Sequence, residues 1–378
     1  MKKLKIVLTG GGTAGHISPL LVVFQELRKR CVSLDVLYIG KKASLEEKLA
    51  KKEQVAFAGL PVSGFTRKFS VKDQINNMKT FCDYVKSVNK ARCLLQQFQP
   101  DLVFASGGYV CAPVLHAACQ LKIKTIIHEQ NEILGLTTRL FKNKVDVLLL
   151  ASATARVQIK RNFNVFVVGN PVDSSFQVAA AGGKKEELGF AEGEFLIVSF
   201  GGSLGARNLN NAVADVFLKI EKLGKVNWVH ATGEIGYHDF IAKLRNNRFD
   251  WSAHKNLDVR KYIFNLPSLI SAADLVISRA GAMTIAELQV AGKACILIPS
   301  PNVANNHQLF NATAIAKSGA GLVLEEKDLL NERLLCEINL LMTNRKILDC
   351  LGEKMAAMAI SDAAEKICKI IENLFGET

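Results

Sequence analysis

Two glycine-rich turns in this chain have the composition of phosphate-binding sites. The apolar run Ile6–Thr9 leads into Gly10–His16, and the run Phe195–Phe200 leads into Gly201–Arg207. Glycine lets the backbone approach an anion closely, and the N–H groups at the start of the following helix point toward it. The two turns therefore predict two nucleotide-binding halves.

His16 closes the first turn and comes just before Ser18-Pro19, a pair typical of a helix N-cap and a first helical residue. An imidazole at this place could take a proton from an attacking hydroxyl group or hydrogen-bond a phosphate. The spacing equally allows a histidine that only caps the turn, so both interpretations stay open.

Two further side chains are placed to hold a sugar nucleotide. Glu287 lies in an early turn of the helix expected after a strand at 275–278, where its carboxylate could accept hydrogen bonds from both hydroxyls of a ribose. It could instead only complement the positive end of that helix. Gln308 lies in a polar loop whose amide side chains can bracket the hydroxyls of a sugar.

Polar residues also follow two strands expected at 102–105 and 125–128, namely Gly107-Gly108-Tyr109 and Glu129-Gln130-Asn131. Ligands of open α/β sheets bind beyond the carboxyl ends of the strands, so we expect these groups at one crevice. The spacing Gly10-x-Gly12-x-x-Gly15 also fits a dinucleotide fingerprint, but the second strand lacks the terminal acid that holds the adenosine ribose. A nicotinamide cofactor is therefore disfavoured, and no other cofactor is expected.

The elements that must position these residues are short apolar strands alternating with amphipathic helices, the pattern of parallel α/β layers. Strands are expected at 4–9, 36–39, 102–105, 125–128, 145–150 and 165–168, then at 195–200, 226–231, 275–278, 295–298 and 321–324. A chain of 378 residues fits two domains. We predict an α/β protein of two Rossmann-like domains facing a cleft, residues 1–168 and 169–360, with a linker within 173–185.

Charge, aromatic content and cysteine spacing limit the classes of partner that can be expected. The net charge of +13 predicts an anionic partner, whereas an aromatic content of 7% without a recognisable module argues against nucleic acid. The nine cysteines form no Cys-x-x-Cys pair and no zinc-ligand spacing, which predicts reduced thiols in a cytoplasmic protein and no metal site. No stretch reaches the roughly 18 apolar residues of a spanning helix, so a membrane would be bound only at its surface.

Seven motifs occur in order along the chain. They are Gly-Gly-Thr-Ala-Gly-His-Ile-Ser-Pro (11–19), Ser-Gly-Gly-Tyr-Val (106–110), His-Glu-Gln-Asn (128–131), Gly-Asn-Pro-Val (169–172), Gly-Gly-Ser-Leu-Gly-Ala-Arg (201–207), Ser-Arg-Ala-Gly-Ala (278–282) and His-Gln-x-x-Asn-Ala (307–312). Jointly they closely resemble the MurG family, the peptidoglycan N-acetylglucosaminyltransferases that make lipid II.

The resemblance implies a GT-B glycosyltransferase fold in which the C-terminal domain holds UDP-GlcNAc and the N-terminal domain holds lipid I. The last helix, within 361–378, would cross back to the first domain. The implied reaction is an inverting transfer of N-acetylglucosamine to the 4-hydroxyl of lipid I, which gives lipid II. The implied donor-binding residues are Thr13, Ala14, Gly15, Asn131, Ser203, Ile263, Ala282, Met283, Thr284, Ile285, Ala286, Glu287 and Gln308, with Ile263 beside the uracil, Glu287 at the ribose and Gln308 at the sugar.

For the implied reaction, His16 is the first candidate for the general base and Glu129 the second, because both are expected on the acceptor side with Tyr109. Helix N-termini near Gly201–Gly205 would stabilise the departing diphosphate, so a metal is not demanded. A UDP-sugar epimerase of the same architecture and a non-catalytic nucleotide-sugar-binding protein remain alternatives.

Three positions depart from the family pattern. Ala14 stands where the family generally has glycine, and its methyl group would cost about 1 kcal/mol if the position requires a positive φ. Asp173 stands where the family tends to have a donor-binding arginine, so that role is not transferred. Leu134 replaces a usual proline, which bears only on the stiffness of the loop.

One segment has the pattern of a membrane-surface helix. Its apolar stripe is Ile75, Met78, Phe81, Val85 and Val88, with Lys68, Lys72, Lys79, Lys86 and Lys90 nearby. Such a helix can lie on an anionic membrane, although a core-facing helix with solvated lysines would show the same periodicity. Because the implied acceptor is lipid-linked, we expect a peripheral protein on the cytoplasmic face of the inner membrane, with UDP-GlcNAc, lipid I and other cell-wall synthesis proteins as partners.

Overall fold

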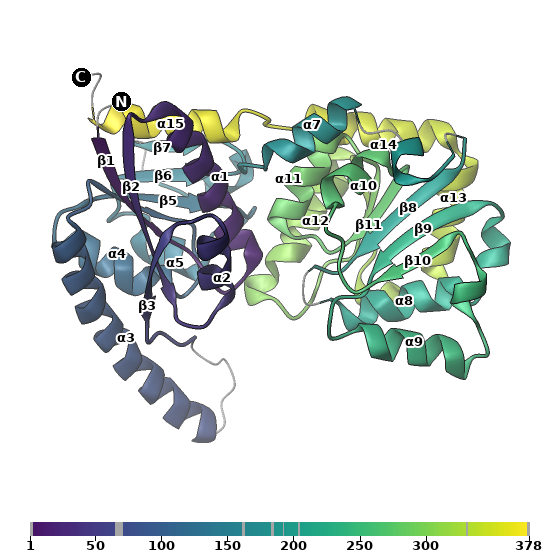
Figure 1. Ribbon diagram of the computed structural model, residues 1–378, viewed down its shortest axis with the longest axis horizontal. Helices are drawn as coiled ribbons and strands as arrows, with labels where there is room; N and C mark the ends of the chain where they lie inside the picture. Colours follow the sequence, from purple (N-terminus) through teal and green to yellow (C-terminus); the bar gives the residue numbers. More distant parts are fainter. Residues whose placement is uncertain are drawn as a thin grey trace. The chain divides into compact units, whose positions relative to one another are not determined.

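The chain folds into two compact units. The computed structural model describes residues 3–64, 71–160, 163–182, 185–191, 193–202, 205–329 and 332–375, without the side chains of 71–77 and 79. One unit comprises Met1–Val172 together with Asp362–Thr378, and the other comprises Asp173–Ser361 (Figure 1). The first unit therefore extends four residues beyond the boundary expected at 168.

The first unit is a parallel sheet with helices on both faces. Its strands are β1 (Lys3–Thr9), β2 (Ser33–Lys41), β3 (Ala56–Leu60), β4 (Leu102–Ala105), β5 (Lys124–Glu129), β6 (Val147–Leu150) and β7 (Val165–Val167). They pair in the order β3-β2-β1-β4-β5-β6-β7. Its helices are α1 (Ala14–Arg30), α2 (Leu45–Lys52), α3 (Val71–Phe98), α4 (Cys111–Gln120), α5 (Leu136–Phe141), α6 (Ala153–Val157) and α15 (Ala363–Phe375).

The second unit repeats this plan with a smaller sheet. Its strands are β8 (Phe195–Phe200), β9 (Val226–Ala231), β10 (Leu257–Arg260), β11 (Leu275–Ser278), β12 (Cys295–Leu297) and β13 (Leu322–Val323), in the order β10-β9-β8-β11-β12-β13. Its α-helices are α7 (Ser174–Gly182), α8 (Arg207–Phe217), α9 (Tyr237–Asn246), α10 (Leu266–Ala272), α11 (Ala282–Ala291), α12 (His307–Ser318), α13 (Arg333–Thr343) and α14 (Arg345–Ala357). Its 3₁₀ turns are η1 (Glu186–Leu188), η2 (Ile220–Leu223), η3 (Trp251–Ala253), η4 (Ala304–Asn306) and η5 (Glu326–Asp328).

The central strands are uniformly apolar because both of their faces are buried. In β4, Leu102 and Phe104 pack in the core layer that contains residues of α1, while Val103 and Ala105 pack in the layer that contains residues of α4. Alternate side chains of a strand point to opposite faces, so each strand supplies both layers. This burial explains why the apolar runs were sufficient to predict the central strands of both sheets.

Two edge strands were missed by the sequence analysis. Strand β3 (Ala-Phe-Ala-Gly-Leu) contains residues of low β-propensity, and β10 (Leu-Asp-Val-Arg) alternates buried Leu257 and Val259 with polar residues. Both lie at the edge of their sheets, where only one neighbour pairs with the strand. Their patterns are therefore weaker than those of the strands at the centre.

The expected linker within 173–185 is wrong for most of its length, because the structure forms α7 there. The run of alanines at 179–181 favours a helix, and Asp173 accepts a hydrogen bond from the Ser175 backbone N–H at 2.8 Å. Phe176 is buried, and α7 packs against α10 and α11. Asp173 thus caps a helix at the position where the family tends to have arginine.

The expected start of the first helix at Ser18-Pro19 is also wrong. Helix α1 begins at Ala14 with Thr13 as its N-cap, and Pro19 lies inside it. Gly12 is the residue of this turn with a positive φ, 88°. Ala14 is the first residue of α1 and has no positive φ. The methyl group of Ala14 therefore costs no backbone strain, and His16 lies in the first turn of the helix.

The last helix, α15, packs on the first unit. Ile367, Cys368 and Ile371 are fully buried in the same core layer as residues of α1, and Glu372 lies 4.0 Å from the Arg30 guanidinium. Figure 1 shows α15 beside α1, the C-terminal helix next to the first one. The C-terminal segment is thus part of the N-terminal unit.

A buried histidine makes the second unit sensitive to acid. Burial lowers the pKa of His230 to about 3, from an ordinary 6.5, so the native state excludes a proton that the unfolded chain accepts. Stability is therefore lost as pH falls below 6.5, by about 1.4 kcal/mol per pH unit from this group. We expect His230→Leu to show a shallower decline in the free energy of unfolding between pH 6 and pH 4.

Urea unfolding followed by tryptophan fluorescence checks this expectation. Trp228 and Trp251, the two tryptophans of the chain, both belong to the second unit, so the signal reports that unit alone. His254→Leu is the matched control, since His254 lies in the same unit, stacked on Phe249, but is only partly buried. Equal pH slopes for wild type and His230→Leu would show that His230 does not govern acid sensitivity.

Candidate functional site

Three adjacent strands of the first unit carry its predicted site residues. Strands β1, β4 and β5 run parallel, so their carboxyl ends meet at one edge of the sheet. That edge bears the segment Thr13–His16 after β1, Tyr109 after β4 and the segment Glu129–Asn131 at the end of β5. The structure therefore brings together residues that are more than a hundred positions apart in the sequence.

His16 is held by contacts from the segments that follow β4 and β5. Its Nδ1 lies 3.0 Å from the Ser106 carbonyl oxygen and 3.0 Å from Gln130 Oε1. The Ser106 hydroxyl in turn donates to the His16 carbonyl oxygen. Among the residues that the structure describes, no partner contacts Nε2 of His16. The ring is thus fixed through one nitrogen while the other stays available.

Close backbone packing builds the turns beside His16. Gly108 has φ of 82°, and a Cβ there would collide with the carbonyl oxygen of Gly11, so only glycine fits. The Thr137 hydroxyl donates to the Gly108 carbonyl at 2.9 Å. The Tyr109 ring lies beside Gly12, since a Cβ on Gly12 would be 3.5 Å from it. Tyr109 therefore borders the glycine-rich turn.

Glu129 is buried and accepts hydrogen bonds from four protein donors. Oε1 accepts from the Asn131 N–H at 3.2 Å and the Asn131 side-chain amide at 3.1 Å. Oε2 accepts from the Gly135 N–H at 2.8 Å and the Thr138 hydroxyl at 2.6 Å. This carboxylate ties the loop after β5 to α5, and its lone pairs are occupied by that task.

The second glycine-rich turn follows β8 in the second unit. Gly202 and Gly205 have φ of 88° and 80°, and a Cβ on Gly205 would collide with the Thr232 carbonyl oxygen. The turn leads into α8, whose first N–H groups have no partner within the helix. Ser203, one of the expected donor-binding residues, lies outside the described residues. Glycine is therefore required at Gly205, where the turn approaches the Thr232 backbone.

Glu287 lies in the second turn of α11, the helix that follows β11. Burial raises the pKa of Glu287 to about 8, and the nearby Asp173 carboxylate raises it further in the same direction. Protein atoms surround the Glu287 carboxyl group, although part of the residue's surface is exposed, as it is at Ala282 and Thr284. Met283, Ile285 and Ala286 are buried.

Ile263 follows β10, and Gln308 lies in the first turn of α12. Ile263 is buried, whereas its sequence neighbours Tyr262 and Phe264 are exposed. Gln308 Oε1 accepts from the Ser300 N–H at 2.8 Å. This bond occupies the amide oxygen and leaves the NH₂ group of Gln308 to donate to a ligand.

Glu326 joins the start of α8 to the turn between β11 and α11, and no sequence pattern indicated this contact. We call this set of side chains, Glu326, Arg279 and Asn208, the brace. Glu326 in η5 pairs with Arg279, which follows β11, and accepts from Asn208 in the first turn of α8 at 2.5 Å. Arg279 also donates to the Ile298 carbonyl at 3.0 Å. The side chains of Arg279 and Glu326 are each only 12% exposed. This brace fixes α8 relative to the β11–α11 turn.

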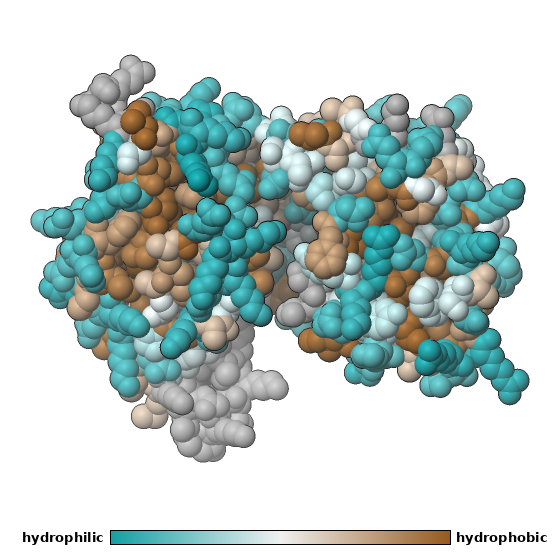
Figure 2. Space-filling view, viewed as in Figure 1, coloured by the Kyte–Doolittle hydropathy of each residue, from teal (hydrophilic) through white to brown (hydrophobic). Residues whose placement is uncertain are grey.

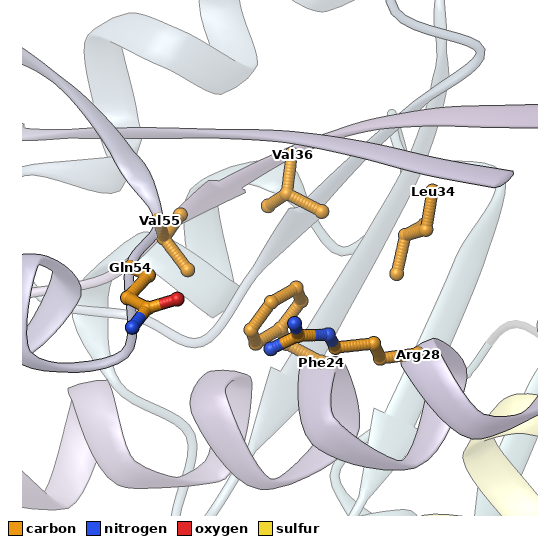
Figure 3. A pocket seen from close by; sticks show the side chains of 6 residues that line it. All are labelled: Phe24, Arg28, Leu34, Val36, Gln54 and Val55. Carbon is orange, nitrogen blue, oxygen red and sulfur yellow. The ribbon is translucent and has the colours of Figure 1, made fainter.

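A hollow of about 200 Å³ lies elsewhere on the first unit (Figure 3). It is lined by Phe24, Arg28, Leu34, Val36, Gln54 and Val55, where the last turns of α1 meet the first residues of β2. These residues are at the amino end of β2, away from the carboxyl ends that carry the site. Figure 2 shows a broad hydrophobic area on the visible face of this unit, bordered by hydrophilic side chains.

Two parallel-sheet α/β domains, each with a glycine-rich turn after its first strand, form the GT-B fold, and the fold expected from the sequence is thereby confirmed. The glycosyltransferase family 28 N-terminal domain matches residues 6–149, and the C-terminal domain of that family matches residues 196–369. The chain belongs to glycosyltransferase family 28.

Individual relatives are similar over their whole length. The Halalkalibacterium halodurans UDP-N-acetylglucosamine--N-acetylmuramyl-(pentapeptide) pyrophosphoryl-undecaprenol N-acetylglucosamine transferase is 36% identical over 375 residues, which cover 98% of this chain and 99% of that protein. Among solved structures, Acinetobacter baumannii MurG has a TM-score of 0.75 at 24% identity, covering 98% and 99% of the two chains. Neisseria meningitidis UDP-GlcNAc 2-epimerase has a TM-score of 0.64 at 12% identity, covering 98% and 99%.

Proposed function

We propose that the chain transfers N-acetylglucosamine from UDP-GlcNAc to the 4-hydroxyl of lipid I and so makes lipid II. The observation that carries this proposal is the 36% identity to the Halalkalibacterium halodurans transferase, because the match extends over 98% of this chain. The fold alone would not decide, since the UDP-GlcNAc 2-epimerase has a similar fold at 12% identity. No feature of the described site specifically favours the epimerase.

The proposed chemistry needs one base and one stabilised leaving group. His16 Nε2 takes the proton of the acceptor 4-hydroxyl while that oxygen forms its bond to the anomeric carbon. The bond from the anomeric carbon to the phosphate oxygen breaks, UDP leaves with the electron pair, and the anomeric centre is inverted. His16 then returns its proton to solvent. Glu129 is less suited to this role, because four donors already occupy its oxygens.

The second unit supplies the donor contacts in this proposal. The start of α8 and the turn Gly201–Gly205 stabilise the negative charge that develops on the departing diphosphate. Glu287 accepts hydrogen bonds from the ribose hydroxyls, Ile263 lies beside the uracil, and the NH₂ group of Gln308 donates to the sugar. The first unit contributes Thr13, Ala14, Gly15 and Asn131 to donor binding. Ser203, which lies outside the described residues, is a further proposed donor-binding residue.

The deciding experiment is transfer of radiolabelled N-acetylglucosamine from UDP-GlcNAc to a short-chain lipid I analogue. Label in the lipid product, dependent on acceptor, is the expected result. A parallel reaction without acceptor distinguishes the alternatives: conversion of the donor without acceptor would support an epimerase, and intact donor in both reactions would support a binding protein.

We further propose that α3 binds the cytoplasmic face of an anionic membrane, where lipid I would be reached. No helix among the described residues is long and apolar enough to span a bilayer. On α3, Met78, Phe81 and Val85 are 73%, 60% and 45% exposed, although side chains of these types are usually buried in a protein core. Spacings of three and four residues place these three on one helical face. Lys68 and the side chains of Lys72, Ile75 and Lys79 lie outside the described part of the chain.

Replacing two exposed residues of this stripe should release the protein from membranes. We expect Met78→Ser with Phe81→Ser to weaken binding to phosphatidylglycerol-containing vesicles at least tenfold, because roughly 25 cal/mol is lost per Å² of apolar surface no longer buried. Cosedimentation measures the effect. The control pairs Val32→Ser with Val157→Ser, two equally exposed apolar residues of the same unit. Equal loss in both pairs, or none, would contradict the assignment to α3.

A further inference from the structure

Two side chains, those of Gln130 and His128, connect His16 to the interior of the first unit. His16 Nδ1 lies 3.0 Å from Gln130 Oε1, and Gln130 Nε2 lies 3.1 Å from His128 Nδ1 and 2.9 Å from the His128 carbonyl oxygen. His128 Nε2 lies 2.9 Å from the Gly169 carbonyl oxygen. His128 and Gln130 are buried. The chain of contacts therefore runs from the sheet edge to a backbone carbonyl at the end of the first unit.

Backbone carbonyls at both ends leave one consistent arrangement of protons. The Gly169 carbonyl only accepts, so His128 must carry its proton on Nε2, and its Nδ1 is then an acceptor. Gln130 faces this nitrogen and the His128 carbonyl, two acceptors, so its NH₂ group lies on that side. Gln130 Oε1 therefore faces His16. Because the Ser106 carbonyl also faces His16 Nδ1, that nitrogen must carry the proton.

We propose that Gln130 and His128 are positioning residues that hold His16 in the Nδ1–H tautomer, with the lone pair of Nε2 open to the acceptor hydroxyl. Every bond in this relay donates in the same direction, from His16 through Gln130 and His128 to Gly169. Bonds aligned in this way polarise one another. When Nε2 gains a proton during the reaction, the Nδ1–H group becomes a stronger donor, and Gln130 Oε1 stabilises the charge that appears.

Burial supports this role for His128. Its pKa is lowered to about 4 because burial disfavours the charged ring, so it stays neutral at neutral pH and keeps an acceptor for Gln130. A protonated His128 would donate from both nitrogens and would force the Gln130 amide to rotate. The rotated amide would turn its NH₂ group toward His16 Nδ1 and reverse the tautomer. The neutral state of His128 thus preserves the direction of the relay.

Nitrogen-15 NMR of the wild-type protein tests the relay directly. With labelled histidine, the spectra distinguish a protonated from an unprotonated ring nitrogen, and the seven histidines are assigned from single substitutions. The expected result is a proton on Nδ1 of His16 and on Nε2 of His128. A proton on Nε2 of His16 would overturn the proposal without any variant having to fold.

A matched pair of glutamine variants tests the effect on turnover. Gln130→Met removes the side-chain bonds to His16 and His128 and should lower kcat about tenfold, since an orienting hydrogen bond is lost, while KM for UDP-GlcNAc stays the same. Gln158→Met is the control: the Gln158 amide joins the Leu134 N–H to the Glu132 carbonyl in the same unit but does not contact His16. Unchanged kcat in Gln130→Met, or an equal loss in Gln158→Met, would overturn the role of Gln130.

The inference rests on His16 being the general base, yet the two claims fail separately. If His16→Ala retains full turnover while the spectrum shows the Nδ1–H tautomer, the proposed base is wrong and the relay stands as a structural feature. If His16→Ala loses turnover while the spectrum shows a proton on Nε2, the base stands and the relay is wrong.

Discussion

His16→Ala should lower the turnover of lipid I by about a hundredfold to ten-thousandfold, the usual contribution of a positioned general base. Among the described residues at the carboxyl edge of β1, β4 and β5, His16 is the only one that combines a fixed ring with a nitrogen that has no hydrogen-bond partner, and the variant loses it. Affinity for UDP-GlcNAc should stay nearly unchanged, because the proposed nucleotide contacts lie mainly in the second unit. The measurement is kcat with saturating donor, alongside calorimetric titration with UDP-GlcNAc.

Two comparisons make this expectation specific. His254→Ala removes a histidine that packs on Phe249 in the other unit, and it should retain full turnover. Glu129→Gln keeps the shape of the side chain that ties the loop after β5, so it separates loss of charge from loss of the residue. If Glu129→Gln abolished turnover while His16→Ala did not, the base would have to be reassigned to Glu129.

The sequence was sufficient to predict the central strands and the place of the candidate site, for a definite physical reason. Strands such as β4 are buried on both faces, so they appear as continuous apolar runs, and parallel strands deliver the residues that follow them to one edge. That rule placed His16, Tyr109 and Glu129 together without any knowledge of contacts. Edge strands β3 and β10 lack the double burial and were missed.

Side-chain contacts across strands could not be predicted, because they depend on distances that no local pattern records. Gln130 belongs to a recognised motif, but only the positions of the Gly169 and Ser106 carbonyls show which end of its amide faces His16. Glu326 belongs to no motif and joins Arg279 to Asn208 only after the second sheet has formed. Such bracing residues are found from the folded structure.

The start of α1 illustrates a different limit. Ser18-Pro19 is a strong local start signal, yet the helix begins earlier at Ala14. Gly12 turns the chain. The Ser106 hydroxyl, which follows another strand, β4, donates to the His16 carbonyl and closes the turn. Tertiary contacts therefore overrode a local preference, and they did so at the residue proposed to carry out the chemistry.

Glu287→Ala should weaken UDP-GlcNAc binding by about tenfold to a hundredfold, the loss expected when a charged acceptor of two hydroxyl hydrogen bonds is removed. Catalysis at saturating donor should change less than affinity, because the ribose lies away from the reacting carbon. Calorimetric titration measures the dissociation constant. Gln289→Ala is the matched control, since Gln289 lies two residues further along α11 and has no proposed contact with the donor.

The raised pKa of Glu287, about 8, adds a pH signature that a purely structural carboxyl would not give. Below pH 8 the free protein holds a proton on this group, and the ribose hydroxyls donate best to the ionised form. Donor affinity should therefore increase as pH rises toward 8 and level off above it, and binding at pH 7 should release protons into the buffer. Glu287→Gln cannot ionise and should show neither effect. Proton release that persists in Glu287→Gln, or a wild-type affinity that is independent of pH, would separate Glu287 from the ribose and return it to a role at the end of α11.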